Sequence, residues 1–289
     1  MTQGVIEEVV AMSKNQRPFL LGALIIVPLC LCLATACASL MTYFLLGEQT
    51  KDDLSGVTEN ISYDDDPVAH YEFEGNTNDS SQYENHGTSE NDLAYIDGPL
   101  GQAIFFENKT ELRVFVSDRD SLDTDYGFTL CAWIKPTHYR NGQGRNAYHM
   151  ILSKWWTTLK RGDYILSIQV GDDEGLLALT VANAEPEFTA DGLRALPSHR
   201  IPLNEWTHVA ATFDRGAMKL FIRGELVAEK MSAVVLHAEL DEYSFDDVMI
   251  GNARANAYNE HGFIGGIDDV RIYNRALSET EIVQLSRID

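Results

Sequence analysis

The chain has few basic side chains, and this scarcity excludes one large class of function. Its 289 residues contain 22 Lys and Arg against 44 Asp and Glu, a net charge of −22. The excess of acid runs along the whole chain, with 9 acidic and 3 basic side chains in residues 1–66 and 35 and 19 in residues 67–289. Because such a surface repels nucleic acid and anionic lipid headgroups, the sequence excludes nucleic-acid binding.

Cysteine is also scarce, and its placement excludes a disulfide framework from most of the chain. Cys30, Cys32 and Cys37 lie within one apolar run, where a thiol acts as a small hydrophobe. Only Cys131 lies beyond that run, in the strand-like segment FTLCAWI. We therefore expect Cys131 to be a buried core residue rather than a reactive thiol.

Residues 18–47 contain no charged side chain and form the one long apolar run. A run of this length crosses a hydrocarbon core of about 30 Å as a helix, so we predict one transmembrane helix. A cleaved signal peptide is the competing interpretation, because Ala34-Thr35-Ala36 has the form of a cleavage site. The apolar run continues to Leu46, well past that site, which favours an uncleaved anchor.

The flanks of this run predict its orientation and the division of the chain. Lys14 and Arg17 precede the run, whereas Lys51 beyond it is followed at once by two aspartates. The positive-inside rule then places the N-terminus in the cytoplasm and the C-terminal part in the periplasm or outside the cell. The predicted domains are a cytoplasmic segment, the helix, an acidic tether and an exported domain, at residues 1–17, 18–47, 48–66 and 67–289.

Small residues gather on one face of the predicted helix, at Cys30, Ala34 and Cys37, with Ala38 close by. Close approach across small side chains supplies the van der Waals contact that holds membrane helices together. This face predicts packing against other membrane proteins. The alternative is an anchor that lies wholly in lipid.

Beyond Pro67 the sequence consists of short β-type runs separated by turn residues. The clearest run places Val209, Ala211 and Phe213 on one face, the period of two of a half-buried strand. Ser278 and Glu281 form a capping box that predicts a short C-terminal helix, and residues 183–200 have the appearance of a long turn-rich insertion. The pattern predicts an all-β sandwich of two antiparallel sheets.

Several sequence blocks make a resemblance specific. They are HYEFEGN with DSS and NHGT, GPLGQAIFF, FTLCAWI, EWTHVA and GGIDDVRIYNRALS, in this order between residues 68 and 286. The chain resembles a LamG-like domain of the concanavalin A-like lectin/glucanase superfamily. This resemblance implies a jelly-roll sandwich but leaves the activity open, because the fold carries lectins, glycosidases and spacers.

The resemblance also implies a pattern for catalysis, which this chain lacks. Glycosidases on this sandwich resemble one another in a Glu-x-Asp-x-x-Glu run along one strand. The nearest run here is Glu239-Leu240-Asp241-Glu242-Tyr243-Ser244, in which serine replaces the last carboxylate. The eight histidines also lack metal-ligand spacing, so we expect no enzymatic activity.

A structural Ca²⁺ is a further implication, because the superfamily often holds one on acidic and carbonyl oxygens. If the first and last strands are neighbours, Glu74, Asn76 and Asp79 lie near Asp268. These four residues are the predicted calcium ligands. The competing interpretation has Asn76 and Asp79 in Asx turns and Asp268 paired with an arginine, Arg271 or Arg275.

Glycan binding requires exposed aromatic rings beside polar groups. The candidates are Trp155, Trp156, Tyr148 and Tyr258, which lie in or beside loops. Core packing or a protein contact explains the Trp pair equally well.

The sequence therefore predicts a membrane-anchored, non-catalytic module that recognises a glycan or an exported protein. The alternative is an accessory structural subunit of a larger membrane complex, and a glycoside-acting enzyme ranks below both.

Overall fold

The structure is a computed structural model. It describes residues 66–107, 112–124, 126–139, 147–156, 161–170, 175–183, 189–234, 236, 247–252 and 262–288. Residues 64–289 form one compact unit. The predicted span at residues 18–47 lies outside the described ranges, and within those ranges no helix is long and apolar enough to cross a membrane. The membrane anchor and its orientation therefore stay predictions.

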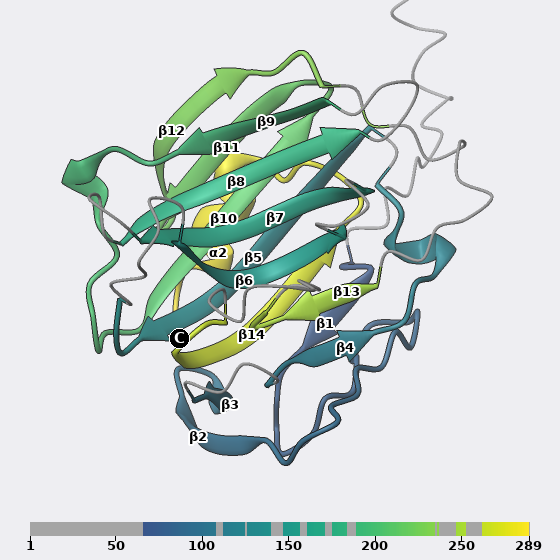
Figure 1. The fold of residues 1–289 in the computed structure, drawn as a ribbon, viewed down its shortest axis with the longest axis vertical. Coiled ribbons are helices and arrows are strands. Elements are labelled where there is room, and N and C mark those ends of the chain that lie inside the picture. Colours follow the sequence, from purple (N-terminus) through teal and green to yellow (C-terminus); the bar gives the residue numbers. More distant parts are fainter. Residues whose placement is uncertain are drawn as a thin grey trace, which may run out of the picture. The chain divides into compact units, whose positions relative to one another are not determined.

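Two antiparallel sheets pack face to face (Figure 1). The larger, eight-stranded sheet has the order β12-β11-β10-β5-β14-β3-β2, and β1 also pairs with β14. The smaller, six-stranded sheet has the order β4-β13-β6-β7-β8-β9. This arrangement confirms the predicted all-β sandwich of two antiparallel sheets.

The strands of the larger sheet are β1 (Ala69–Tyr71), β2 (Ala94–Gly98), β3 (Gly101–Phe106), β5 (Gly127–Pro136), β10 (Thr207–Asp214), β11 (Ala217–Ile222), β12 (Glu225–Met231) and β14 (Gly265–Tyr273). Those of the smaller sheet are β4 (Val114–Val116), β6 (Ala147–Trp156), β7 (Arg161–Val170), β8 (Leu176–Asn183), β9 (Thr189–Arg194) and β13 (Val248–Ile250). The helical elements of the described residues are the 3-10 turns η1 (Asp120–Leu122) and η2 (Pro197–His199) and the α-helix α2 (Glu279–Leu285).

The hydrophobic core lies between the sheets and follows the predicted alternation. Val209, Ala211 and Phe213 of β10 point into it, as do Leu177 and Leu179 of β8. The outward residues His208, Ala210 and Thr212 of β10, however, are buried as well, and Asp214 at its end is exposed. The expected half-buried strand is therefore covered on both faces over much of its length.

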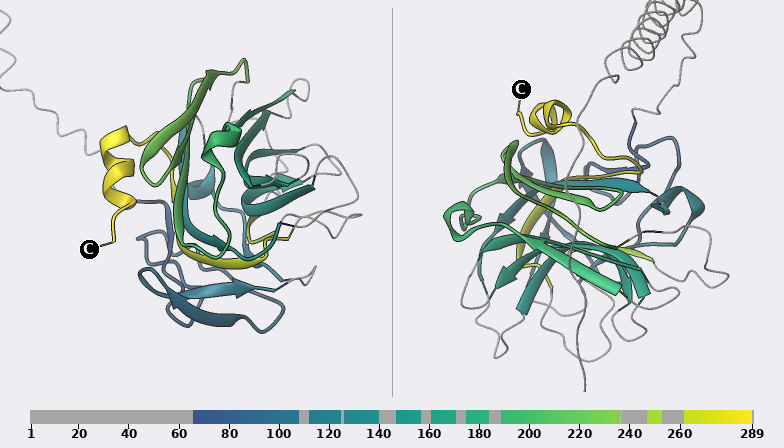
Figure 2. Two further views of the ribbon diagram at one scale, coloured as in Figure 1. Left: turned by 90° about the vertical axis from the view of Figure 1, so that its left-hand side faces the viewer. Right: turned by 90° about the horizontal axis from the view of Figure 1, so that it is seen from above.

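The helix α2 provides part of that cover (Figure 2). Its Ile282 packs with Cys131, Ala210 and Phe221 on the outer face of the larger sheet. The predicted capping box is confirmed, since Glu281 N donates to the Ser278 side chain and the Glu281 carboxylate accepts from Ser278 N. Cys131 is buried as expected, and burial raises the pKa of its thiol to about 12.

The prediction of a long insertion at residues 183–200 was wrong, because β9 lies within it. β9 pairs along its length with β8, from Thr189 opposite Asn183 to Arg194 opposite Ala178. Only Leu193 is buried in this edge strand, so its sequence lacks the apolar alternation that would have indicated it.

The predicted contact between the first and last strands is confirmed. Ala69 lies opposite Ile272 and Tyr71 opposite Val270 in an antiparallel pair. The pairing brings the segment that follows β1 next to the acidic part of β14.

Candidate functional site

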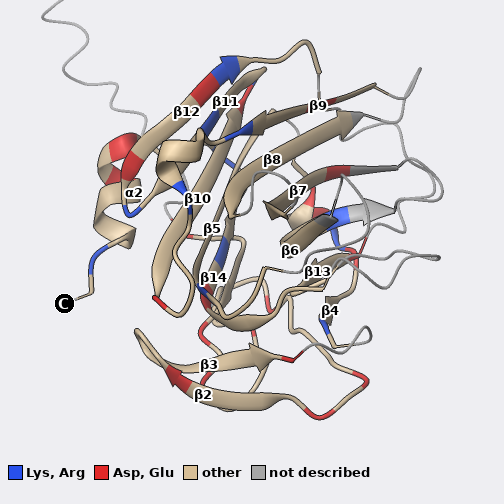
Figure 3. Ribbon diagram, turned by 60° about the vertical axis from the view of Figure 1, so that its left-hand side comes forward, with Lys and Arg blue, Asp and Glu red and all other residues tan. Residues whose placement is uncertain are grey.

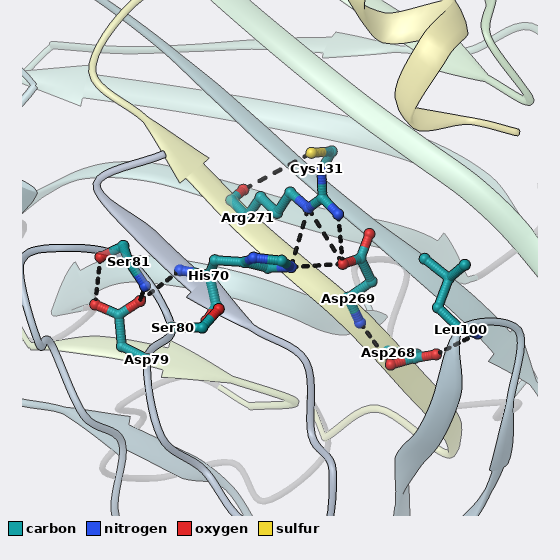
Figure 4. Close-up of polar contacts among 9 residues, drawn as sticks. All are labelled: His70, Asp79, Ser80, Ser81, Leu100, Cys131, Asp268, Asp269 and Arg271. Carbon is teal, nitrogen blue, oxygen red and sulfur yellow. Dashed lines mark hydrogen bonds and ion pairs between the residues drawn. The ribbon is translucent and has the colours of Figure 1, made fainter. Parts of the chain in front are cut away.

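A polar pocket of about 250 Å³ lies where β1 and β14 meet the hairpin of β2 and β3. Figure 4 shows the central part of its lining. The lining residues are His70, Glu72, Glu74, Leu100, Asp268, Asp269 and Arg271. With four carboxyl groups and a single arginine, this pocket favours ligands that bring positive charge or hydrogen-bond donors.

A bulge in β14 places two consecutive carboxyl groups at this pocket. Asp268 lies opposite Trp133 of β5, but the next pair joins Arg271 to Cys131, so β14 holds one extra residue. Asp269 adopts φ of 47°, a left-handed conformation that aspartate tolerates better than most residues. The bulge places both carboxyl groups in the lining of the pocket, and bulges beside functional sites often redirect side chains in this way.

Asp269 forms an ion pair with Arg271 and contacts the imidazole of His70. Its Oδ1 lies 2.7 Å from Nε2 of His70 and accepts from Arg271 Nη2 at 2.9 Å and Nε at 3.1 Å (Figure 4). Burial alone raises the pKa of Asp269, but the hydrogen bond from His70 and the charge of Arg271 outweigh burial and lower it. Asp269 is therefore a compensated anion.

Asp268 differs, because its hydrogen-bond partners are backbone amides. Its carboxyl oxygens accept from Asp269 N at 2.7 Å and Leu100 N at 3.3 Å, and no ion pair of Asp268 occurs among the described residues. Burial raises its pKa to about 6. The two amides oppose this rise, whereas the charges of Asp269 and Glu74 add to it. The predicted ion pair of Asp268 with Arg271 or Arg275 was wrong, since Arg271 pairs with Asp269 and Arg275 with Glu281.

Two glycines allow the β2–β3 hairpin to lie directly on these carboxyl groups. A Cβ at Gly98 would overlap Oδ2 of Asp268, and a Cβ at Gly101 would overlap Oε1 of Glu74. Gly101 also adopts φ of 122°, which only glycine adopts readily. Because Glu74 Oε1 accepts from Gln102 N at 2.9 Å, the hairpin is fastened to both carboxylates.

The four predicted calcium ligands separate into two groups. Glu74 and Asp268 line the pocket, whereas Asn76 and Asp79 do not. Asn76 Oδ1 accepts from Asn78 N, which is the Asx turn of the competing interpretation. In the described residues, no group of three or more His, Cys, Asp or Glu is arranged to hold a metal. The oxygen donors of Glu74 and Asp268 fit a hard cation, and the other two residues serve the local fold.

Asp79 has a structural role, because its carboxylate accepts four hydrogen bonds from nearby groups. Its Oδ1 accepts from His70 N at 2.7 Å and from Ser81 N at 2.8 Å, and its Oδ2 accepts from Ser81 Oγ and Asn85 N at 2.7 Å each. These four bonds tie the loop after β1 to the strand itself, and Figure 4 shows those from His70 and Ser81.

The predicted glycan contacts are only partly described. Tyr148 is half-buried in β6 and packs against Met150 and Ile165. Trp155 and Trp156 end β6, but their side chains are outside the described part of the structure. Further predictions lie wholly outside the described residues, at Tyr258, Cys30, Ala34, Cys37, Ala38 and the run at 239–244.

Sequence reasoning missed a second cluster of carboxylates, centred on Lys154 of β6. This lysine is 2% exposed, and its Nζ lies 2.6 Å from Asp123, 3.3 Å from Asp163 and 3.7 Å from Asp118. Figure 3 shows the basic segment of β6 beside the acidic segment of β7. Leu152 and Lys154 share one side of a strand, so a charged residue at a core position was the available signal.

The comparison with protein families gives one match. The family model described as "Concanavalin A-like lectin/glucanases superfamily" matches residues 108–283, most of the described sandwich. Comparison of the sequence with curated proteins gives no match.

Solved structures share the fold at low sequence identity. Domain 4 of AbnA, a GH43 extracellular arabinanase from Geobacillus stearothermophilus in complex with arabinotriose, has a TM-score of 0.58 at 20% identity, with 76% of this chain and 98% of that chain covered. The binding domain of Paraclostridial Mosquitocidal Protein 1 gives 0.59 at 18% identity, with 77% and 52% covered. The binding domain of botulinum neurotoxin serotype G gives 0.58 at 16% identity, with 76% and 50% covered. The chain thus spans about half of each toxin binding domain, and these likenesses concern the fold alone.

Proposed function

Because the chain belongs to the concanavalin A-like lectin/glucanase superfamily, we propose that it is a non-catalytic recognition module held at a membrane. Residues 18–47 serve as an uncleaved helical anchor with a cytoplasmic N-terminus. Residues 48–66 form an acidic tether, and the sandwich of residues 67–289 lies on the extracytoplasmic side. Its ligand is a glycan or an exported protein.

The observation that carries this proposal is that the sandwich resembles domains that bind. Two of the similar structures are toxin binding domains, and the third is an arabinanase domain in complex with arabinotriose. The last of these supports a glycan as the first ligand to test. The acidic surface favours a neutral or cationic ligand over a polyanion.

We test this function with the full chain purified in mild detergent, on a glycan array and by mass spectrometry of co-purifying proteins. Saturable binding to defined glycans supports recognition. No binding to any glycan on the array, together with a stoichiometric set of co-purified membrane proteins, would instead favour the accessory subunit. Protease added to spheroplasts tests the topology, because digestion of the sandwich with residues 1–17 protected is the expected result.

A structural Ca²⁺ extends the proposal, with Glu74 and Asp268 as its protein ligands. Both residues line one pocket, and calcium would supply the positive charge that Asp268 does not receive from the chain. We expect Ca²⁺ at a hundredfold excess over its dissociation constant to stabilise the chain by about 2.7 kcal/mol in thermal unfolding. Glu74→Gln should remove this shift, whereas an unchanged melting curve in chelator would exclude the site.

A further inference from the structure

One aromatic ring stands apart from all the others that the structure describes. Tyr126, just before β5, is 64% exposed, and every other described Phe, Tyr or Trp side chain is buried or half-buried. Tyrosine on a surface is a frequent anchor of binding sites, because it offers a large rigid contact area together with a polar end.

Arg215 lies next to Tyr126, and Met231 lies beside the same turn as Arg215. The guanidinium of Arg215, in the turn between β10 and β11, lies 5.9 Å from the centre of the Tyr126 ring. Arg215 N also donates to Tyr126 O at 2.9 Å. Met231, which ends β12, is 71% exposed, and its methyl group lies beside Gly216 of the same turn. We refer to Tyr126, Arg215 and Met231 as the Tyr126 patch.

Arg215 has a left-handed backbone conformation that residues other than glycine rarely adopt. It adopts φ of 45°, where a side chain crowds its own carbonyl and where Gly or Asn is the usual choice in a two-residue hairpin turn. Most lysines and arginines of the described sheets pair with acids, whereas Arg215 makes no ion pair among the described residues. Arg223, in the turn between β11 and β12, adopts a similar φ of 53° but pairs with Glu205, so Arg215 is set apart by its missing ion pair rather than by its backbone.

We propose that the Tyr126 patch is a glycan-contact site that takes a neutral sugar ring, an inference that rests on the proposed recognition function. The apolar C–H face of the sugar packs on the Tyr126 ring, and the N–H groups of Arg215 donate to its hydroxyls. Met231 closes one edge of the contact as an adaptable apolar side chain. A polyanionic glycan is disfavoured, because a single guanidinium is set in a chain of net charge −22.

The pocket beside the β2–β3 hairpin does not compete for this role. Among the described residues of its lining, Leu100 is the only apolar one, and the only ring is the imidazole of His70, which is bonded to Asp269. A sugar ring could form hydrogen bonds there but would find no Phe, Tyr or Trp ring on which to stack. The two sites therefore suit different ligands, a cation in the pocket and a sugar ring on the patch.

The test is isothermal titration calorimetry of the full chain with arabinotriose and other neutral trisaccharides, which measures the binding affinity. Tyr126→Ala should weaken binding roughly tenfold, since it removes the stacking surface. Arg215→Gly should weaken binding severalfold, while its melting temperature is unchanged or raised because glycine fits the turn. Two controls should bind within about twofold of the natural chain: Tyr126→Phe, which keeps the ring, and Leu196→Ala, at an exposed leucine away from the patch.

The outcomes separate this inference from the recognition function. If the natural chain binds a neutral glycan and Tyr126→Ala binds it equally well, the patch assignment is overturned and recognition stands. If the natural chain binds only anionic glycans, the assigned ligand class is overturned. If it binds no glycan, and Tyr126→Ala and Arg215→Gly release a co-purified protein that Leu196→Ala retains, the patch is a protein interface and the inference is wrong.

Discussion

Two groups of carboxylates in this sandwich differ in whether the chain supplies a cation that neutralises them. Around Lys154, three aspartates converge on an ammonium group that the chain itself supplies. Beside the β2–β3 hairpin, Glu74 and Asp268 line one pocket, and their hydrogen-bond partners among the described residues are backbone amides. The first group has its own cation, whereas the second does not.

The pKa of Lys154 expresses this difference, although burial outweighs the charge of Lys154 at Asp163 and raises the pKa of that carboxyl group as well. Burial lowers the pKa of Lys154, but the charge of Asp163 leads the interactions that outweigh burial and hold the pKa above its usual range. At the hairpin, burial raises the pKa of Asp268 to about 6. A closed ion cluster is a structural element, whereas an uncompensated buried carboxyl group has affinity for a proton or another cation. This contrast is why we assign the ligand to the hairpin pocket and not to the Lys154 cluster.

The largest expected effect is at Lys154. Lys154→Met keeps most of the side-chain volume but leaves three aspartates without their shared cation. Removing one partner of a buried ion cluster costs about 3–5 kcal/mol, and we expect a loss of this size in denaturant unfolding. A loss below about 1 kcal/mol would show that water replaces the ammonium group and that the cluster is not closed.

Gly101→Ala should have the next largest effect, because it separates the hairpin from Glu74. The new Cβ meets the Glu74 carboxylate at a residue with φ of 122°, so we expect a loss of about 2–4 kcal/mol. Gly192→Ala is the matched control, since its Cβ would have only ordinary contacts at 3.7 Å. If the overlap contributes, Glu74→Ala should recover part of the loss in a double-mutant cycle, and the remainder measures the backbone strain.

The uncompensated state of Asp268 predicts a pH dependence. Its pKa is raised in the folded chain, to about 6, above its ordinary value of 3.8. The native state therefore binds more protons than the unfolded state between these values, and this group contributes stability below about pH 4 that is lost as the pH rises through 6.

Asp268→Asn removes this titration and is the variant that checks it. Relative to the natural chain, the variant should gain about 1–3 kcal/mol between pH 4 and pH 6, whatever its stability at the lower pH. Urea unfolding across this range measures the difference. A difference that is independent of pH would mean that Asp268 is as well compensated as Asp269, and the comparison of the two carboxylate groups would then fail.

Sequence reasoning anticipated the scaffold better than the contacts. Alternation identified β10, and a capping box identified α2, because both signals are local in the chain. Glu74 and Asp268 were brought together correctly from the expected pairing of the first and last strands. Asp269 escaped notice, because its place in the pocket depends on a bulge that alternation does not indicate.

The residues missed by the sequence share a dependence on distant partners. The aspartates around Lys154 come from the segments next to η1 and from β7, and no spacing in the sequence joins them. Tyr126 lies beside Arg215, and Met231 beside Gly216, only because β5, β10, β11 and β12 are neighbours in one sheet. The positive φ of Arg215, in the turn between β10 and β11, has no sequence signal beyond the glycine that follows.

The smallest expected effect is at Lys230, and it determines whether burial is the cause of the contrast. Lys230 and Asp191 pair at 2.5 Å, close to the shortest contact of Lys154, but their side chains are 33% and 34% exposed. Lys230→Met should cost less than about 1 kcal/mol, and the cost should fall further at about 1 M salt, because exposed pairs are screened. The hydrogen bond from Lys230 lowers the pKa of Asp191, so the pair's contribution is present above the ordinary carboxyl pKa and is lost in acid. If Lys230→Met costs as much as Lys154→Met under the same conditions, burial does not set the energy, and the case for an unfilled cation site at Asp268 loses its physical basis.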